Sequence, residues 1–171
     1  MKQVSKNWFV FYTKSRQEKK VFSLLTRRGL EVFLPTQKVM RQWSDRKKKV
    51  EVPLFNSYIF VRETEDKIPS ILQTPGVAWN IRHNNKPAIL QTKELENIKR
   101  FLASGLFLES HQFDRLEVGD PVEVIDGPLK GMLGHLIKTS DGDRFTVALE
   151  SIGQTIMVRI VPTVLRKKPR N

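Results

Sequence analysis

The hydrophobic positions near the start of the chain predict a strand followed by a helix. Residues 8–12 are aromatic or β-branched, which is typical of a strand. Apolar residues then recur at helical spacing between positions 21 and 28, and Gly29 supplies a C-terminal stop. Ser15, with Glu18 three residues later, predicts the N-terminus of this helix.

Similar patterns continue to about residue 103. They predict strands over 32–34, 54–61 and 77–82, a β-hairpin with a basic middle over 39–50, a short helix over 66–73 and a longer helix over 92–103. The resulting order, β-α-β-β-β-α-β-α, predicts an α+β fold in which helices pack on an antiparallel sheet.

The last third of the chain changes character. Glycine and proline punctuate short β-branched runs there, which predicts a small β-barrel with a thin core. Residues 105–115 show no clear period. We therefore predict an N-terminal domain over residues 1–105, a linker over 106–115 and a barrel domain over 116–171.

Charge distinguishes these two parts. The chain carries a net charge of +12. Residues 1–110 hold 21 Lys/Arg and 10 Asp/Glu, whereas residues 111–171 hold 9 and 8. A polyanion or an acidic protein surface is the expected partner of the first part, and the barrel is expected to have a different one.

The residues that usually carry catalysis are missing or scattered. There is no cysteine, and the three histidines, His83, His111 and His135, are far apart in the sequence. No paired carboxylates or phosphate-binding loop appears, so we expect no enzyme activity, no metal and no other cofactor. Without a signal peptide or an apolar run of spanning length, we expect a cytoplasmic protein with no membrane partner.

Several segments resemble one known family. VGDPVEVIDGPLKGMLG, at residues 118–134, resembles a KOW motif, in which glycines permit tight turns and close strand crossing. WFVFYTKSRQEKKV at 8–21 and VPLFNSYIFV at 52–61 resemble the NusG N-terminal (NGN) domain, and TPGV at 74–77 and KPAI at 86–89 also fit. The resemblance to the NusG family covers roughly residues 7–167. One departure is Asn56-Ser57, where the family commonly has Pro-Gly, so this turn is expected to differ in shape.

This resemblance implies a monomeric transcription elongation and antitermination factor that binds RNA polymerase through the NGN domain and recruits a partner through the KOW domain. The basic segment 41–48 is similar to the specialised, operon-specific UpxY-type and RfaH paralogues. Two alternatives stay open: a general housekeeping NusG, or a KOW-type protein that binds ribosomal RNA.

The resemblance also implies a polymerase-binding patch. Family members bind the β′ clamp helices through an apolar patch of the NGN sheet, and the matching residues are Val10, Tyr12, Phe55, Tyr58 and Phe60. Aromatic side chains suit such contacts, because they bury a large area at low entropic cost. Strand alternation leaves an alternative, in which one of these pairs packs in the domain's own core. Residues 67–70 fall near a possible contact to the β gate loop.

Two basic clusters are candidates for binding nucleic acid, either a non-template strand or upstream duplex DNA. Phosphate attraction would supply affinity, and Arg16 or Gln17 could read a base edge. Trp43 could stack on a base or anchor the hairpin. Solvated surface charge is the alternative for both clusters. The candidates are Lys14, Arg16, Gln17, Lys19 and Lys20 at the first helix, and Arg41, Trp43, Arg46, Lys47 and Lys48 on the hairpin.

In the KOW loop, Leu129 and Met132 occupy the positions that meet ribosomal protein S10 or Rho in NusG. They could present apolar side chains to such a partner, or they could plug the end of the barrel. RfaH hides this domain as a helical hairpin, but glycine, proline and valine disfavour helix here, so we predict a barrel.

Overall fold

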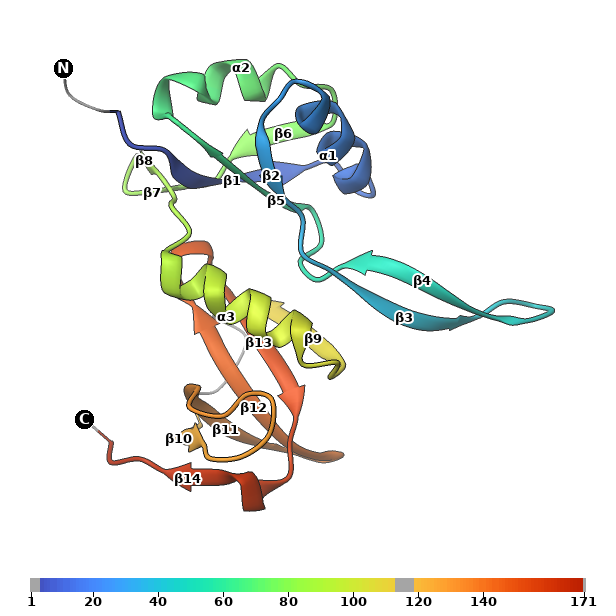
Figure 1. Ribbon diagram of the computed structural model, residues 1–171, viewed down its shortest axis with the longest axis vertical. Helices are drawn as coiled ribbons and strands as arrows, with labels where there is room; N and C mark the ends of the chain where they lie inside the picture. The colour runs from blue at the N-terminus through green and yellow to red at the C-terminus, as the bar shows by residue number, and fades with distance from the viewer. Residues whose placement is uncertain (1–3, 113–118, 171) are drawn as a thin grey trace. The chain divides into compact units, whose positions relative to one another are not determined.

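The computed structural model describes residues 4–112 and 119–170, and it comprises two compact units (Figure 1). Unit 1 contains the residues up to Thr36 together with 51–92. Unit 2 contains residues 37–50 and those from Lys93 onward. The N-terminal sheet lies in unit 1 and the C-terminal barrel in unit 2.

Unit 1 is built on a four-stranded antiparallel sheet with the order β2-β5-β1-β6. The central pair is β1 with β5, in which Val10 lies opposite Phe60 and Tyr12 opposite Tyr58. The strands are β1 (Asn7–Thr13), β2 (Glu31–Phe33), β5 (Tyr58–Glu63) and β6 (Val77–Asn80).

Two helices, α1 (Glu18–Arg27) and α2 (Ile68–Leu72), cover one face of this sheet (Figure 1). A one-turn 3-10 helix, η1 (Glu65–Lys67), precedes α2. An apolar cluster forms the core between the helices and the sheet: Phe9, Phe11, Val21, Leu25, Ile59, Val61, Ile68, Ile71 and Val77. Successive strand residues point to opposite faces, so the alternate residues of β1 and β5 face away from the helices.

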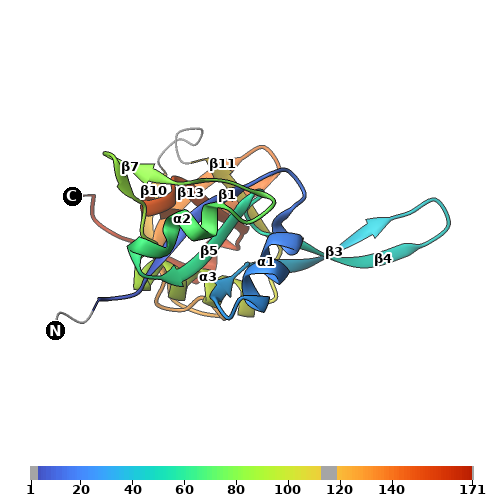
Figure 2. The ribbon, with the colours of Figure 1, turned by 90° about the horizontal axis from the view of Figure 1, so that it is seen from above.

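Two hairpins complete this half of the chain. The short one joins β7 (Arg82–His83) to β8 (Lys86–Pro87). The long one joins β3 (Thr36–Gln42) to β4 (Lys47–Pro53), and its two strands form the extended ribbon visible in Figures 1 and 2. The predicted hairpin over 39–50 is thus part of a longer element.

Unit 2 contains helix α3 (Thr92–Ala103) and a six-stranded antiparallel sheet with the order β14-β10-β11-β12-β13-β9. The helix packs on the barrel, where the Phe101 and Phe145 ring centroids lie 6.3 Å apart. The strands are β9 (Leu108–Gln112), β10 (Asp120–Val124), β11 (Leu133–Thr139), β12 (Gly142–Leu149), β13 (Gln154–Arg159) and β14 (Leu165–Lys167), with the 3-10 turns η3 (Glu150–Ile152) and η4 (Pro162–Val164).

The α+β fold class is confirmed, but the structure divides the chain differently from the sequence-based boundary at residue 105. Helix α3 lies in the same unit as the barrel, because its Arg100 Nη2 donates to the Lys130 carbonyl at 2.7 Å and Phe101 packs on Phe145. Residues 108–112, expected in the linker, instead form β9, in which buried Leu108 pairs with β13. Residues 113–115 of the predicted linker lie outside the described residues.

Gly134 shows why glycine is required inside the barrel. A Cβ at this position would collide with the Thr146 carbonyl oxygen and with the Phe145 ring. Its neighbour Leu133, by contrast, is 53% exposed. Strands β11 and β12 can therefore approach this closely only where the side chain is missing.

We expect Gly134→Ala to destabilise the barrel by about 1–3 kcal/mol, because the added methyl group must displace backbone or the Phe145 ring. Chemical denaturation monitored by circular dichroism would measure the loss. Leu133→Ala is the matched control and should change stability far less. Equal unfolding midpoints for Gly134→Ala and the wild type would contradict the close strand crossing.

Candidate functional site

The face of the unit 1 sheet that points away from α1 and α2 is lined by aromatic residues. Tyr12 stacks on Trp79 with ring centroids 4.3 Å apart and an interplanar angle of 10°. Tyr58 packs edge-on against both Tyr12 and Phe55, at 5.7 and 6.4 Å. The aromatic face, as we call it, comprises Trp8, Val10, Tyr12, Phe33, Phe55, Tyr58, Phe60 and Trp79.

The five polymerase-binding candidates therefore come together on one surface. Because Val10 lies opposite Phe60 and Tyr12 opposite Tyr58, neither pair belongs to the core beneath the helices. Phe9, Phe11, Ile59 and Val61 fill that core instead.

The five candidates differ in exposure, and three of them are buried. Val10, Phe55 and Phe60 are at most 1% exposed. Tyr12 and Tyr58 are half-buried, and Trp79 is 52% exposed. Phe60 is packed between Phe33 and Phe55, at 6.1 and 6.4 Å. The accessible part thus consists of Trp79 and the half-buried Trp8, Tyr12, Phe33 and Tyr58, whereas Val10, Phe55 and Phe60 lie beneath the surface.

Trp79 was not among the residues singled out from the sequence. It lies opposite Tyr12 on β6, next to an irregularity in the β1–β6 register between Tyr12 and Thr13. This irregularity hides the simple alternation that would otherwise have indicated its face. The sequence indicated only that Trp79 lies in the strand predicted over residues 77–82, without indicating which face of the sheet it occupies.

The turn before Tyr58 is held by the first residue of α1. Ser57 has φ of 66°, in the left-handed region that favours glycine. Its N–H donates to Oε1 of Glu18 at 2.8 Å, and its carbonyl accepts the N–H of Thr13, also at 2.8 Å. Glu18 is only 7% exposed, and it lies at the helix N-terminus, where the macrodipole favours a carboxylate. Glu18 therefore positions the turn, although Ser57 occupies a glycine-like conformation.

The basic cluster near α1 is mostly exposed. The helix begins after Gln17, not after Ser15 as predicted, and Arg16 has φ of 60°. Lys19 Nζ donates to the Glu51 carbonyl at 2.6 Å, so this cation is already engaged. Gln17 is half-buried, whereas Lys14, Arg16 and Lys20 are exposed and form no ion pair with any described residue.

The distal part of the long hairpin, Met40–Lys49, is exposed at every position. We call this segment the arm. The backbone N–H of Trp43 donates to the Arg46 carbonyl at 2.8 Å, so Ser44 and Asp45 form the turn between the two strands. Lys48 Nζ lies 5.3 Å from the centroid of the Trp43 ring, a cation–π contact that fixes the indole.

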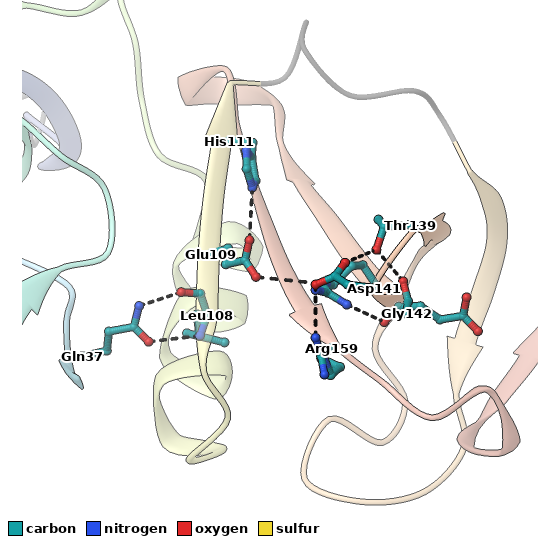
Figure 3. A network of polar contacts seen from close by, with 10 residues as sticks. Gln37, Leu108, Glu109, His111, Thr139, Asp141, Gly142 and Arg159 are labelled. Carbon is teal, nitrogen blue, oxygen red and sulfur yellow. Dashed lines mark hydrogen bonds and ion pairs between the residues drawn. The ribbon is translucent and has the colours of Figure 1, made fainter. Parts of the chain in front are cut away.

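Ion pairs neutralise many cations of the barrel. Asp141 accepts from Arg159 at 3.2 Å (Figure 3) and from Arg144 at 2.8 Å, and Arg144 also lies 3.8 Å from Glu109. The hydroxyl of Thr139 and then the Arg144 guanidinium hold the pKa of Asp141 below its ordinary value. Elsewhere on the barrel, the paired cations are Arg166 and Lys168 with Glu123, and Arg170 with Asp120.

The KOW-loop candidates are buried, which corrects the expectation of an apolar docking loop. Leu129 is 2% exposed and Met132 is 3% exposed. Two backbone hydrogen bonds close the loop: the Met132 N–H donates to the Leu129 carbonyl at 3.0 Å, and the Gly131 N–H donates to the Val124 carbonyl at 2.7 Å. The two side chains plug the barrel, which was the alternative given by the sequence.

Residues 67–70 begin at the end of η1 and continue into α2. Ser70 is held by the Arg28 guanidinium, which also donates to Thr74 Oγ1 at 2.8 Å. Within the described residues, no group of His, Asp and Glu side chains is arranged to hold a metal ion. No helix of the described chain has the length and apolar character needed to cross a membrane.

An antiparallel sheet with helices on one face and aromatic side chains on the other, followed by a small glycine-rich barrel, defines a protein of NGN–KOW architecture. A family model described as "Transcription termination factor nusG" matches residues 6–99. The chain therefore belongs to the NusG family and is a NusG-like transcription termination/antitermination factor. Proteins of this family are transcription factors that act with RNA polymerase.

Relatives and solved structures agree with this assignment. The transcription termination/antitermination protein NusG of Lactococcus lactis is 27% identical over 167 residues, covering 90% of this chain and 88% of that protein. The protein of the same name from Bacillus subtilis is 27% identical over 179 residues, covering 96% and 99%. A structure titled "Domain interaction in Thermotoga maritima NusG" has a TM-score of 0.59 at 18% identity, covering 96% of this chain and 98% of that one, and supports the fold.

Ser57→Gly should stabilise the protein by about 0.5–1 kcal/mol, because relief of the left-handed strain outweighs the added freedom of the unfolded chain. Thermal unfolding would show a rise of a few degrees. The neighbouring Asn56→Gly is the control; it relieves no positive φ and should lower stability. Destabilisation by Ser57→Gly comparable to that by Asn56→Gly would argue against strain at Ser57.

The lowered pKa of Asp141 predicts an acid-dependent loss of barrel stability. A carboxylate whose folded-state pKa is depressed contributes stability above its unfolded pKa and loses it as pH falls through the folded value. Urea midpoints measured from about pH 6 to about pH 3 should therefore fall less steeply for Asp141→Asn than for the wild type. Asp126→Asn removes one exposed carboxylate from a turn of the same unit and is the matched control. Parallel curves for Asp141→Asn and the wild type would contradict the role of this network.

Proposed function

We propose that the protein binds RNA polymerase through the aromatic face and acts as an antitermination and processivity factor. The observation that carries this proposal is the concentration of aromatic residues on the sheet face that α1 and α2 leave uncovered. Their polymerase partner is the pair of β′ clamp helices. The β gate loop is a further partner, contacted through residues 67–70.

The chemistry of Tyr12, Tyr58 and Trp79 suits a helical partner. Each ring offers a large apolar area, and the hydroxyl or indole N–H can keep a hydrogen bond at the edge of the contact. Residues of these types dominate binding energy in well-packed interfaces. Val10 and Phe60 contribute by holding the tyrosines in position from beneath the surface, since they lie opposite each other in the β1–β5 pair.

Nucleic acid is the second proposed partner. Lys14, Arg16 and Lys20 near α1 form no ion pair with described residues, and the arm cations share this property. Exposed cations without partners are available to replace the counterions of phosphate groups. The alternative, binding of ribosomal RNA by the barrel, is less favoured, because most of the described barrel cations already pair with carboxylates.

The proposed mechanism requires no catalysis. A factor that binds one polymerase conformation more tightly than another shifts the equilibrium by the difference in its binding free energies. Binding that favours an elongating state over a paused state is therefore sufficient for processivity. We propose a specialised, operon-specific role on the basis of the basic segment 41–48, with a general NusG role as the alternative.

We propose that the barrel recruits a second partner, such as S10 or Rho, through residues other than those expected from the sequence. Leu129 and Met132 are buried, so the accessible apolar side chains nearby are Ile125 and Leu133, at 40% and 53% exposure. Glu123 pairs with Leu133 across the β10–β11 ladder, and Ile125 lies two residues further along the same side. These residues suit a small, transient contact.

Tyr58→Ala/Trp79→Ala should reduce polymerase binding at least about tenfold, because two interface aromatics are truncated. Quantitative pull-down of core polymerase by the tagged full-length chain would measure this loss. Leu133→Ala/Val161→Ala removes two exposed apolar side chains of the barrel and is the matched control. Undiminished binding by the first variant would reject the aromatic face as the polymerase contact, provided circular dichroism shows both variants folded.

A further inference from the structure

We propose that the arm is a two-faced cationic ribbon that inserts into a groove of duplex DNA and contacts both phosphate backbones. This inference rests on the proposed function, because it specifies the nucleic acid that the basic hairpin binds. It depends on the placement of charge on β3 and β4 and on the exposure of this segment, which Figures 1 and 2 show as a long two-stranded ribbon.

The hydrogen bond from the Trp43 N–H to the Arg46 carbonyl fixes which residues share a face. Two residues further from the turn on each strand, Arg41 lies opposite Lys48. Successive side chains along a strand point to opposite faces of the ribbon, and residues that lie opposite each other share a face. The contact between Lys48 and the Trp43 ring, diagonal across the same face, agrees with this register. Face A thus carries Arg41, Trp43, Arg46 and Lys48, and face B carries Met40, Gln42, Lys47 and Lys49.

Cations lie on both faces of the ribbon. Face A has Arg41, Arg46 and Lys48, and face B has Lys47 and Lys49, with Lys38 on the same face just before the arm. All six are exposed, and none forms an ion pair with a described residue. A hairpin that lay flat on one strand of nucleic acid would need cations on one face only. Cations on both faces fit a position with phosphates on both sides.

The width of the groove favours duplex DNA over duplex RNA, and the small number of aromatic residues in the arm favours a duplex over a single strand. The B-DNA major groove is about 12 Å wide and admits a two-stranded β-ribbon. The major groove of an RNA duplex is deep and too narrow for side chains to read. Single strands are usually bound by stacking on several exposed aromatic rings, but the arm has only Trp43, and Lys48 occupies one side of that ring. The arm is therefore suited to backbone contacts in a wide groove.

The test uses the full-length chain without polymerase. Fluorescence anisotropy would measure binding to a mixed-sequence DNA duplex of about 24 base pairs, longer than the stretch one short ribbon can cover, over a salt series. The face A variant is Arg41→Gln/Arg46→Gln/Lys48→Gln, and the face B variant is Lys38→Gln/Lys47→Gln/Lys49→Gln. Lys86→Gln/Lys93→Gln/Lys138→Gln removes the same charge from exposed positions outside the arm and is the matched control.

Each face variant should weaken duplex binding by about tenfold or more at low salt and reduce the slope of log K against log salt by about 2–3, whereas the control changes both little. Weakened duplex binding by only one of the two face variants would overturn insertion into a groove. Unchanged duplex binding by both variants would overturn DNA binding by the arm. Equal or tighter binding to the single strand or to an RNA duplex would overturn the choice of duplex DNA.

Polymerase pull-down with the same variants separates this inference from the proposed function. The face A and face B variants leave Tyr12, Tyr58 and Trp79 intact, so polymerase binding should persist while binding to free DNA is lost. Wild-type polymerase binding together with wild-type DNA binding in both variants would overturn the arm inference alone. Failure of Tyr58→Ala/Trp79→Ala to affect polymerase binding would overturn the polymerase contact and leave the DNA measurement standing.

Discussion

The antiparallel pairing of β1 with β5 is the constraint on which unit 1 depends. It fixes Val10 opposite Phe60 and Tyr12 opposite Tyr58, and it thereby assigns every other residue of both strands to the helix-covered core. A shift of one residue in this register would exchange the two sets and bring the aromatic face under α1 and α2. Burial of Phe11 and Ile59 against the helices opposes such a shift, because an aromatic or aliphatic side chain moved to solvent loses roughly 1.5–3 kcal/mol.

The turn before β5 is stabilised by the nearly buried carboxylate of Glu18 and destabilised by the positive φ of Ser57. Ser57 occupies a conformation that glycine would adopt more easily, yet its N–H is bound by a nearly buried Glu18 carboxylate. A hydrogen bond to a charged acceptor contributes about 1.5–3 kcal/mol, which is comparable to or larger than the strain. The helix that covers one face of the sheet thus also determines where the strand carrying Tyr58 begins on the other face.

The sequence predicted the elements better than their assembly. Periodicity located the strands and helices of unit 1, and the glycine-rich repeats of residues 118–134 indicated the barrel, because both signals are local. Helix α3 and residues 108–112 were assigned to the first domain and the linker, since their contacts with Phe145 and β13 are made across more than forty residues. Leu129 and Met132 could not be assigned to surface or interior from the sequence, because an apolar loop residue has no period. Trp79 was missed because a register irregularity interrupts alternation on β6.

Charge pairing gives the barrel and the arm different electrostatic properties. On the barrel, Asp141 and Glu123 each lie between two cations, which reduces the field that a polyanion would meet. On the arm, Asp45 in the turn is the single acidic residue among the cations. Mutual repulsion along such a ribbon destabilises it in isolation and is relieved when phosphates approach. Binding of a polyanion is therefore favoured twice, by attraction to the phosphates and by the loss of this repulsion, and both contributions weaken as salt screens the charges.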